Sequence, residues 1–270
     1  MKQTILGLRA ETSIHAGTGQ NNGVIDMPIM REAHTGYPCV FGSAVKGAFR
    51  AHTEVRRKDL NINIKKVFGD AGEEGNASNI SMTDARLLLL PVRSLTGHFK
   101  LLTCPAILQR LKRDMQMMGM QASFDIPELD SQKVIGKDIG AEGIFLEEFK
   151  FTYGGGLPDG LAQFLEGFGA ENLKGQLIVM DNEDFAWFAK NATVVTPHIQ
   201  IEDKEKKVVK NGALWYEETL PSDALLYTML MGEDEHVNSV LGMFEDKPFI
   251  QIGGNETVGM GWCKVEVLDE

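Results

Sequence analysis

Two ionisable residues near the start of the chain, Asp26 and His15, are of types that act as catalytic groups. Asp26 is the only acid between Glu11 and Glu32, in a loop rich in glycine and asparagine, and His15 opens the sequence HAGTG. An isolated carboxylate could orient or deprotonate a ribose 2′-hydroxyl, or hold a divalent ion. An Asx turn and a histidine packed into a turn use the same residues, so the spacing leaves both alternatives open.

A basic helix is predicted to follow this loop, over residues 43–57. Ser43 is an N-cap type of residue after Gly42, and its hydroxyl can satisfy a free backbone N–H. At 3.6 residues per turn three cations fall on one narrow stripe, namely Lys46, Arg50 and Arg57. Four apolar residues are predicted to pack inward: Val45, Ala48, Phe49 and Val55. A helix N-terminus followed by cations suits a phosphate backbone, although an ordinary amphipathic surface helix has the same pattern.

A third chemistry-bearing segment is the glycine-rich sequence GGNETVGMG, residues 253–261. Glycine permits positive φ and lets another backbone approach closely, and the four glycines are Gly253, Gly254, Gly259 and Gly261. No GK[ST] follows, so the segment is not a P-loop, and no helix with a ribose-binding acid follows, so it is not a dinucleotide fingerprint. By itself it is equally typical of a glycine-rich hairpin or bulge. No HExxH, GxSxG or cluster of metal ligands occurs in the sequence.

The charge of the chain restricts the class of protein. A net charge of −11 argues against indiscriminate nucleic-acid binding. The charge is uneven, because residues 44–66 hold seven lysines and arginines against two acids, whereas residues 214–270 hold two lysines against twelve acids. This asymmetry predicts a basic surface for RNA or for a neighbouring copy of the chain, although solvated faces would give the same pattern.

The start of the chain and its cysteines predict a cytoplasmic protein with no membrane contact. Residues 1–13 lack the apolar core of a signal peptide, and no apolar run approaches the roughly 20 residues that span a bilayer. Cys39, Cys104 and Cys263 form no CxxC pair, which supports neither a disulfide framework nor a zinc knuckle.

The remaining pattern predicts an α+β protein, with strands first and last and with helices and hairpins between them. The predicted strands are residues 2–12, 144–153, 177–181, 249–252 and 262–267, and residues 80–95 are expected to form one or two strands. The predicted helices are residues 102–113, opened by Thr103 and Pro105, and residues 182–192, 222–231 and 233–245. Residues 194–218 alternate on both sides of a charged tip, which predicts a long β-hairpin projecting from the body.

Several of these segments taken together resemble one known family. IHAGTG (14–19) followed by IDMPIMREAHTGYPCVFGSAVKGAFR (25–50), with the closing GGNETVGMGW (253–262), is similar to the RAMP proteins of CRISPR systems in their Cas-seven-like backbone group. NISMTDARLLLLPVRSLTG (79–97) and LWYEETLPSDALLYTML (214–230) resemble the fourth Cmr subunit family of type III-B effector complexes. The resemblance spans nearly the whole chain.

The resemblance implies a fold and a set of partners. The fold is a single RAMP domain over residues 1–270, with a modified RRM or ferredoxin-like palm, finger-like insertions at about 51–80 and 110–145, and a thumb hairpin at 194–218. Copies stack head to tail along one crRNA together with other Cmr subunits, and the thumb separates guide and target at regular intervals. The acidic end of one copy is expected to meet the basic insert of the next. The sheet lacks obvious RNP-type aromatics, so base stacking on the palm is not implied.

The resemblance also implies an endoribonuclease that cuts complementary single-stranded target RNA, and it assigns residues to that reaction. Asp26 matches the acid on which cleavage depends, activating or positioning a 2′-hydroxyl for attack on the adjoining phosphate. The products would include a 2′,3′-cyclic phosphate, and Mg²⁺ or another divalent cation, bound together with RNA, would assist. His15, Glu217 and Glu218 are supporting catalytic candidates. The crRNA backbone is expected to contact Ser43, Lys46, Arg50 and Arg57 and the four glycines of residues 253–261.

Three alternatives stay open at this point. One is a crRNA-binding scaffold subunit that has lost cleavage, and the presence of Asp26 speaks against it. The second is the type III-A backbone counterpart, which shares HAGTG and GSAVKG but fits PVRSLTG and WYEETLP less well. The third is a ribonuclease of the same superfamily that processes crRNA precursors, which the thumb-like hairpin disfavours.

Overall fold

The structure, a computed structural model, describes residues 1–21, 23–60, 62–70, 75–140, 142–170, 175–202, 207–208 and 214–268, with the backbone alone for 57–60, 201–202 and 207–208. Its helices are α1 (Gly42–Leu60), α2 (Ile64–Phe68), α3 (Pro105–Met117), α4 (Leu161–Glu166), α5 (Asn182–Asn191) and α6 (Asp234–Leu241). Its strands are β1 (Lys2–Ala10), β2 (Cys39–Val40), β3 (Ile80–Met82), β4 (Ala85–Arg93), β5 (Phe99–Thr103), β6 (Lys133–Gly136), β7 (Ile144–Leu146), β8 (Phe149–Gly155), β9 (Leu177–Met180), β10 (Val194–Ile199), β11 (Ile201–Glu202), β12 (Lys207–Val208), β13 (Leu214–Thr219), β14 (Leu225–Gly232), β15 (Phe249–Gln251) and β16 (Trp262–Leu268).

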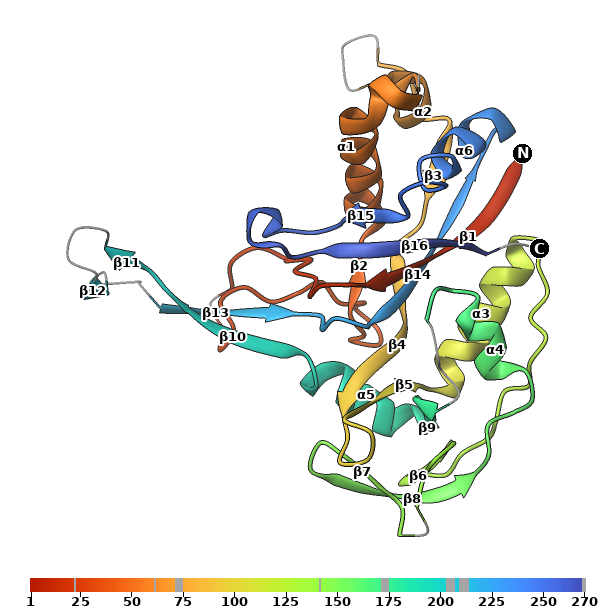
Figure 1. The fold of residues 1–270 in the computed structure, drawn as a ribbon, viewed down its shortest axis with the longest axis vertical. Helices are drawn as coiled ribbons and strands as arrows, with labels where there is room; N and C mark the ends of the chain where they lie inside the picture. The colour runs from red at the N-terminus through yellow and green to blue at the C-terminus, as the bar shows by residue number, and fades with distance from the viewer. Residues whose placement is uncertain are drawn as a thin grey trace.

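Four antiparallel strands, in the order β16, β1, β14 and β4, form the palm of the molecule (Figure 1). Along the chain they are the fourth, first, third and second strands, with α1 after the first and α6 after the third. This is the βαββαβ arrangement of ferredoxin-like domains, so the predicted fold class is confirmed. Residues 94–224 are inserted between the second and third palm strands.

The insertion extends the palm sheet. The first part of β4 pairs with β14, and its last part pairs with β5, which is followed across the sheet by β9, β6, β8 and β7. The four consecutive leucines of residues 87–90 in β4 are all completely buried. Successive side chains of a strand point to opposite faces of the sheet, so these leucines are buried on both faces. This is typical of a central strand that is covered on both sides.

Protein covers the face of the palm that lies away from α1 and α6. Gly7, Tyr227 and Arg86 are in register on three neighbouring strands and therefore point to the same face. Tyr227 Oη and Arg86 Nη1 both donate to Asp114 Oδ2 of α3, each at 2.6 Å. A Cβ at Gly7 would lie 2.1 Å from the carbonyl oxygen of Phe168, so glycine lets the segment after α4 close on the sheet.

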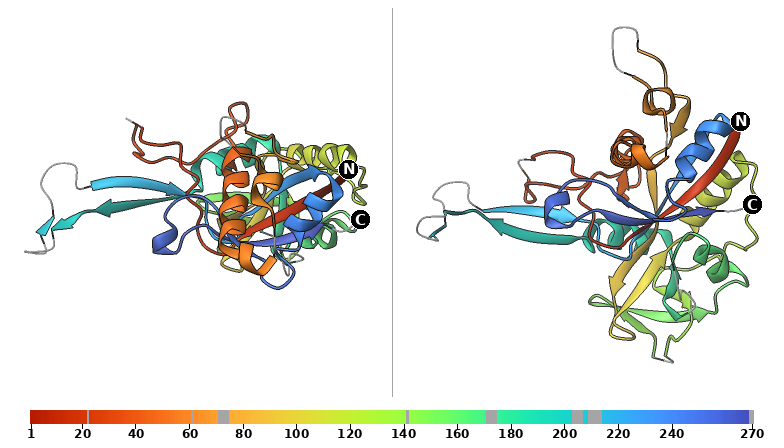
Figure 2. Two further views of the ribbon diagram at one scale, coloured as in Figure 1. Left: turned by 90° about the horizontal axis from the view of Figure 1, so that it is seen from above. Right: turned by 45° about the horizontal axis from the view of Figure 1, so that its top comes forward.

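Figures 1 and 2 place α1 and α6 on one side of β1 and β16, and α3 and α4 on the other. An RRM commonly uses the sheet face away from its helices to stack bases on aromatic side chains. Here that face is filled by the insertion, which agrees with the lack of RNP-type aromatics in the sequence.

Helix α1 packs on the segment after α6 through residues on its inner side. Phe49 is completely buried, and its ring meets that of Phe244 edge-on at 5.4 Å between centroids. Thr53 is also completely buried, and its hydroxyl donates to the carbonyl of Phe49 at 2.8 Å. The prediction that Val55 packs inward is wrong, because its side chain is 85% exposed. At about 100° per residue Val55 lies roughly 240° around the helix from Phe49.

Two helix predictions need correction. Residues 222–231 were expected to be helical, but β14 occupies most of that segment as an inner palm strand between β1 and β4. Its apolar run is almost completely buried, and periodicity cannot distinguish such a run from a buried helix. Helix α3 begins at Pro105 with Cys104 in the cap position, and Thr103 belongs to β5, which pairs with β9. Residues 144–153, expected as one strand, form the hairpin of β7 and β8.

The projecting hairpin of residues 194–218 is present. β10 and β13 pair over six residues from Val194↔Thr219 to Ile199↔Leu214, and β11 and β12 continue the same hairpin outward. Figure 2 shows the hairpin leaving the body at one end of the molecule in both views. The charged side chains predicted at its tip lie outside the residues whose side chains the structure describes.

Residues 51–80 comprise the end of α1, α2 and the start of β3, and residues 110–145 comprise the end of α3, β6 and the start of β7. Their assignment as finger-like insertions of a single RAMP domain stays a prediction. In the described part of the chain, every helix is too short or too polar to cross a membrane.

Candidate active site

Three segments that are far apart in the sequence meet at the base of the β10–β13 hairpin (Figure 1). The loop after β1 runs along the edge of β13 that faces away from β10, where Met27 N donates to the carbonyl of Tyr216 at 3.0 Å. The loop before β16 closes on the same region, where Gly254 N donates to the carbonyl of His15 at 2.8 Å. The start, the hairpin and the end of the chain therefore build one site.

Asp26 lies at this base with its carboxylate fixed from one side. Its Oδ2 accepts a hydrogen bond from the backbone N–H of Tyr216 at 2.8 Å, and its own carbonyl accepts one from Asn21 N at 2.8 Å. The carboxylate bonds across to β13 rather than to its own loop, so it does not form the Asx turn considered above. Among the described residues Asp26 has no lysine or arginine partner, and its side chain is only partly buried.

Glu217 of β13 is the centre of a polar cluster beside Asp26. Its side chain is buried, yet three side chains reach its two oxygens. His15 Nδ1 lies 3.3 Å from Oε1, Asn255 Nδ2 donates to the same oxygen, and His198 Nε2 lies 3.7 Å from Oε2. We call His15, His198, Glu217 and Asn255 the Glu217 cluster. His15 Nδ1 is also 2.8 Å from the carbonyl of Glu218, and His15 is only 5% exposed.

Glu218 points away from this cluster, because successive side chains of a strand alternate between its faces. Its Oε1 accepts from Arg31 Nη2 and, at 2.6 Å, from the hydroxyl of Thr193, and its Oε2 accepts from Ile29 N at 3.1 Å. These contacts tie the loop after β1 to the hairpin. Of the two adjacent carboxylates Glu217 contacts His15, one of the predicted catalytic residues, and Glu218 joins the scaffold.

The glycine-rich loop shapes the site through two close contacts. Gly253 has φ of +93°, and a Cβ there would lie 2.6 Å from the carbonyl oxygen of His15. Gly261 has φ of +83°, and a Cβ there would lie 2.2 Å from the carbonyl oxygen of Ile252. Both positions therefore need glycine for the fold. Gly259, with φ of +84°, has open space around it, so its backbone conformation rather than a close contact favours glycine, and its contact with crRNA stays a prediction.

The predicted RNA-binding helix presents an accessible face near its start. Ser43, Lys46, Gly47 and Arg50 are spaced i, i+3, i+4 and i+7 and so share one side of α1. A Cβ at Gly47 would meet nothing within 4 Å. Lys46 has no carboxylate partner among the described residues, and burial, followed by the nearby Arg50, lowers its pKa.

Arg50 is less available than Lys46. Its Nε pairs with Glu54 Oε1 at 3.3 Å, and its Nη1 donates to the carbonyl of Gly69 at 3.3 Å. The side chain of Arg57 lies outside the part of the chain whose side chains are described. Among the side chains of this helix that the structure describes, Lys46 is therefore the cation that is free to meet an anion.

Ser43 does not cap the helix as predicted. Helix α1 begins one residue earlier, and the carbonyl of Phe41 accepts from Ala44 N at 2.8 Å and from Val45 N at 3.0 Å. The first helical N–H, that of Gly42, is satisfied by Asp84 Oδ1 at 2.7 Å. Because the carboxylate of Asp84, the residue before β4, takes the capping role, Ser43 is left exposed for other contacts.

The free carboxylate oxygen of Asp26 suits a divalent ion whose other ligands come mainly from RNA. Among the described residues no three histidine, cysteine or acidic side chains are grouped as a metal site. Asp26 offers one carboxylate oxygen, since Oδ2 already accepts from Tyr216 N. Mg²⁺ is often bound by one or two carboxylates together with waters and substrate phosphates, which this arrangement allows.

Sequence reasoning did not select His198 and Asn255 of the Glu217 cluster. Each lies in a segment that was recognised, His198 in the hairpin and Asn255 in the glycine-rich loop. The signal that could have found His198 is its register opposite Trp215, two residues before Glu217, which places its side chain on the same face of the hairpin as that carboxylate.

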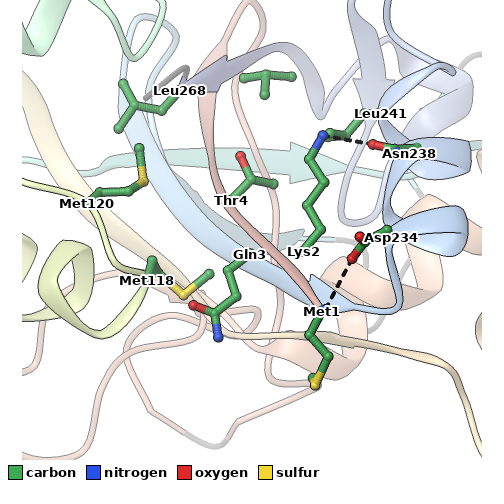
Figure 3. A pocket seen from close by; sticks show the side chains of 11 residues that line it. Met1, Lys2, Gln3, Thr4, Met118, Met120, Asp234, Asn238, Leu241 and Leu268 are labelled. Atoms are coloured by element: carbon green, nitrogen blue, oxygen red, sulfur yellow. Dashed lines mark hydrogen bonds and ion pairs between the residues drawn. The ribbon is translucent and has the colours of Figure 1, made fainter.

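A cavity of about 670 Å³ at the far end of the molecule is separate from this site (Figure 3). It lies between the start of β1, α6 and the residues after α3, and Lys2 Nζ donates to Asn238 Oδ1 at 2.7 Å along its wall. None of its eleven lining residues belongs to the site predicted from the sequence.

Comparison with known proteins identifies the family. The model of the RAMP superfamily matches residues 8–264. The chain is 35% identical to the CRISPR system Cmr endoribonuclease Cmr4 of Pyrococcus furiosus, over 100% of this chain and 97% of that protein. It is 22% identical to the CRISPR system CMR subunit Cmr4 of Saccharolobus solfataricus, over 97% of this chain and 96% of the relative.

Solved structures agree with this result. The crystal structure of oligomeric Cmr4 from Pyrococcus furiosus superimposes with a TM-score of 0.78 at 30% identity, covering 100% of this chain and 99% of the other. A cryo-EM structure of the type III-B Cmr-beta complex bound to cognate target RNA contains a chain that superimposes with a TM-score of 0.82 at 20% identity. The match covers 99% of this chain and 98% of the other, which shows the shared fold. The resemblance predicted from the sequence is confirmed, and the chain belongs to the RAMP superfamily.

Proposed function

We propose that this protein is a backbone subunit of a type III-B CRISPR effector complex that binds crRNA and cleaves complementary target RNA. The observation that carries the proposal is the placement of Asp26. Its carboxylate is anchored by β13 at the base of a projecting hairpin, with one oxygen left for a ligand. Full-length identity of 35% to a protein named as a Cmr endoribonuclease supports the same reaction class.

In the proposed reaction Asp26 takes the proton of a ribose 2′-hydroxyl, and the 2′-oxygen attacks the adjoining phosphorus. A divalent ion, when bound, would neutralise charge on that phosphate. The hairpin positions the target, because apolar side chains on it are 40–53% exposed and can pack against an unstacked base: Val194, Val195, Ile199, Leu214 and Tyr216. The accessible face of α1 near its start, with Lys46, holds the guide backbone.

The proposed partners are crRNA, target RNA, further copies of this chain and other Cmr subunits. Oligomeric Cmr4 of Pyrococcus furiosus supports assembly of copies. The proposed location is the cytoplasm, because the three cysteines are unpaired, as is typical of a reducing compartment.

The test is to assemble the complex on a defined guide and to incubate it with complementary and non-complementary RNA. Regularly spaced cuts in the complementary strand only, ending in 2′,3′-cyclic phosphate, are expected. Cuts that disappear with a chelator and return with Mg²⁺ would support the metal part of the proposal. Stable binding of the complementary strand without any cuts would instead establish the scaffold function.

Replacing Lys46 with alanine is expected to weaken guide binding about tenfold per subunit and to reduce the slope of log affinity against log salt by about 0.7, the value for one phosphate contact on a single strand. Filter binding of the guide at several salt concentrations between 50 and 300 mM measures both the affinity and the slope, because salt screens the phosphate contact. Lys133→Ala is the matched control, because that lysine pairs with Asp130 on the surface at 2.7 Å. An unchanged slope for Lys46→Ala would exclude the contact.

A further inference from the structure

The reaction proposed above needs a proton donor for its leaving group, and the hairpin carries one suitable side chain. When the 2′-oxygen bonds to phosphorus, the bond from phosphorus to the 5′-oxygen breaks. An alkoxide leaves slowly unless a positioned acid protonates it, which contributes about 10²- to 10⁴-fold in rate. Asp26, which receives the 2′-hydroxyl proton, cannot give a proton to the other oxygen in the same step.

His198 has the geometry of such an acid. Its Nε2 is buried, has no hydrogen-bond partner among the described residues, and lies 3.7 Å from Glu217 Oε2, slightly beyond hydrogen-bond length. The side chain as a whole is 32% exposed, so the opposite ring nitrogen, Nδ1, is available to a ligand. A carboxylate behind one nitrogen orients an imidazole and stabilises its charged form, while the other nitrogen exchanges the proton.

The rest of the Glu217 cluster holds this pair in place. The Trp215 ring stacks on the His198 ring with centroids 5.5 Å apart and planes 15° apart, which fixes the plane of the imidazole. The other oxygen of Glu217 accepts from Asn255 Nδ2, so the carboxylate is held from the opposite side.

The other histidine of the cluster cannot take the same role. His15 is only 5% exposed, and a Cβ at Gly17 would lie 2.5 Å from its Nε2, so backbone covers the ring. Its Nδ1 is already occupied by Glu217 Oε1 and the carbonyl of Glu218. His15 is therefore a positioning residue that acts through Glu217.

His198 and Asp26 reach β13 from its two edges. The segment of Met27 bridges to Glu217 on one edge, and β10 pairs on the other. Neighbouring strands lie about 4.8 Å apart, so the two backbones are about 10 Å apart. Side chains that lean inward from this distance can contact the two oxygens that flank one phosphate.

We propose that His198, oriented by Glu217, is the general acid of cleavage; the proposal rests on the ribonuclease function above. The 2′-hydroxyl gives its proton to Asp26 and bonds to phosphorus, the bond from phosphorus to the 5′-oxygen breaks, and imidazolium Nδ1–H protonates that oxygen. The products are a 2′,3′-cyclic phosphate and a 5′-hydroxyl. Solvent then returns a proton to His198 and takes one from Asp26.

The test compares two target RNAs in the assembled complex, one normal and one with sulfur in place of the bridging 5′-oxygen at a single cut position. A thiolate leaves without protonation, because thiols have a pKa near 8.5. His198→Ala is expected to slow cleavage of the normal RNA about 10²-fold or more. The same variant is expected to cleave the sulfur-containing RNA at a rate within about threefold of the wild-type rate. Asp26→Asn is expected to be slow on both RNAs, because 2′-hydroxyl activation is still needed.

His34→Ala is the matched control, since the His34 side chain is 79% exposed and lies outside the Glu217 cluster. Binding of guide and target by His198→Ala is measured first, and equal binding establishes that the variant assembles. Equal slowing on both RNAs would assign His198 a positioning role and overturn the proposal, as would full activity on the normal RNA. Absence of cleavage by the wild-type complex on either RNA would instead refute the ribonuclease function.

Discussion

Replacing Asp26 with asparagine is expected to slow cleavage of complementary RNA by about 10³-fold, with guide and target binding unchanged to within about twofold. Asparagine keeps an oxygen that can accept from the backbone N–H of Tyr216, so the loop stays attached to β13. The substitution removes the negative charge and the proton-accepting oxygen. Binding is retained because Asp26 is not part of the basic face of α1.

The measurement is a single-turnover rate in the assembled complex, with binding of the same RNA determined in parallel. Asp130→Asn, which changes a 78% exposed aspartate on the surface, is the matched control. A variant that cuts at the wild-type rate would remove Asp26 from the reaction. A variant that loses target binding together with cleavage would assign Asp26 a structural role.

The second large effect is expected in stability. Glu218→Ala should lower the free energy of unfolding by about 3 kcal/mol, because it removes the carboxylate that accepts from Arg31 Nη2, from the Thr193 hydroxyl and from the Ile29 N–H. Arg31 Nη1 keeps its bonds to the carbonyls of Gly36 and Ala189. The value lies at the low end for a broken buried pair, since the side chain of Arg31 keeps 23% exposure and can be partly solvated.

Urea unfolding followed by circular dichroism measures this loss. Glu217→Ala, one residue away on the other face of β13, is the matched control and should cost only about 1–2 kcal/mol, because it loses hydrogen bonds rather than an arginine pair. An equal loss for both variants would contradict the division of the two glutamates into a site residue and a scaffold residue. The same pair should separate in activity, with Glu217→Ala slowing cleavage.

The sequence predicted most elements because their apolar residues repeat with a regular period. It failed at β14, where LLYTMLMG is apolar except for Thr228 and has no period to separate a central strand from a buried helix. It failed at Ser43 because the cap is Asp84, which is distant in the chain and has no local signal.

The candidate site divides in the same way. Asp26 and Lys46 were found because they stand inside motifs that resemble a family. No motif singles out His198 or Asn255. They are identified as site residues only because the hairpin register and the glycine-rich loop bring them to Glu217. The choice between Glu217 and Glu218 also needed the register, because adjacent residues of a strand are distinguished only by which face is buried.

The order in which the chain is synthesised has a consequence for the closing of the palm. β1 is synthesised well before one of its two neighbours, β16, and the glycines that contact His15 come just before β16. Such distant pairings make folding slow, because the ends of a long chain must meet before either is stabilised. A nascent or prematurely terminated chain would thus present the Asp26 loop without its closing partner. Ribonuclease activity would therefore require a chain whose synthesis has passed β16.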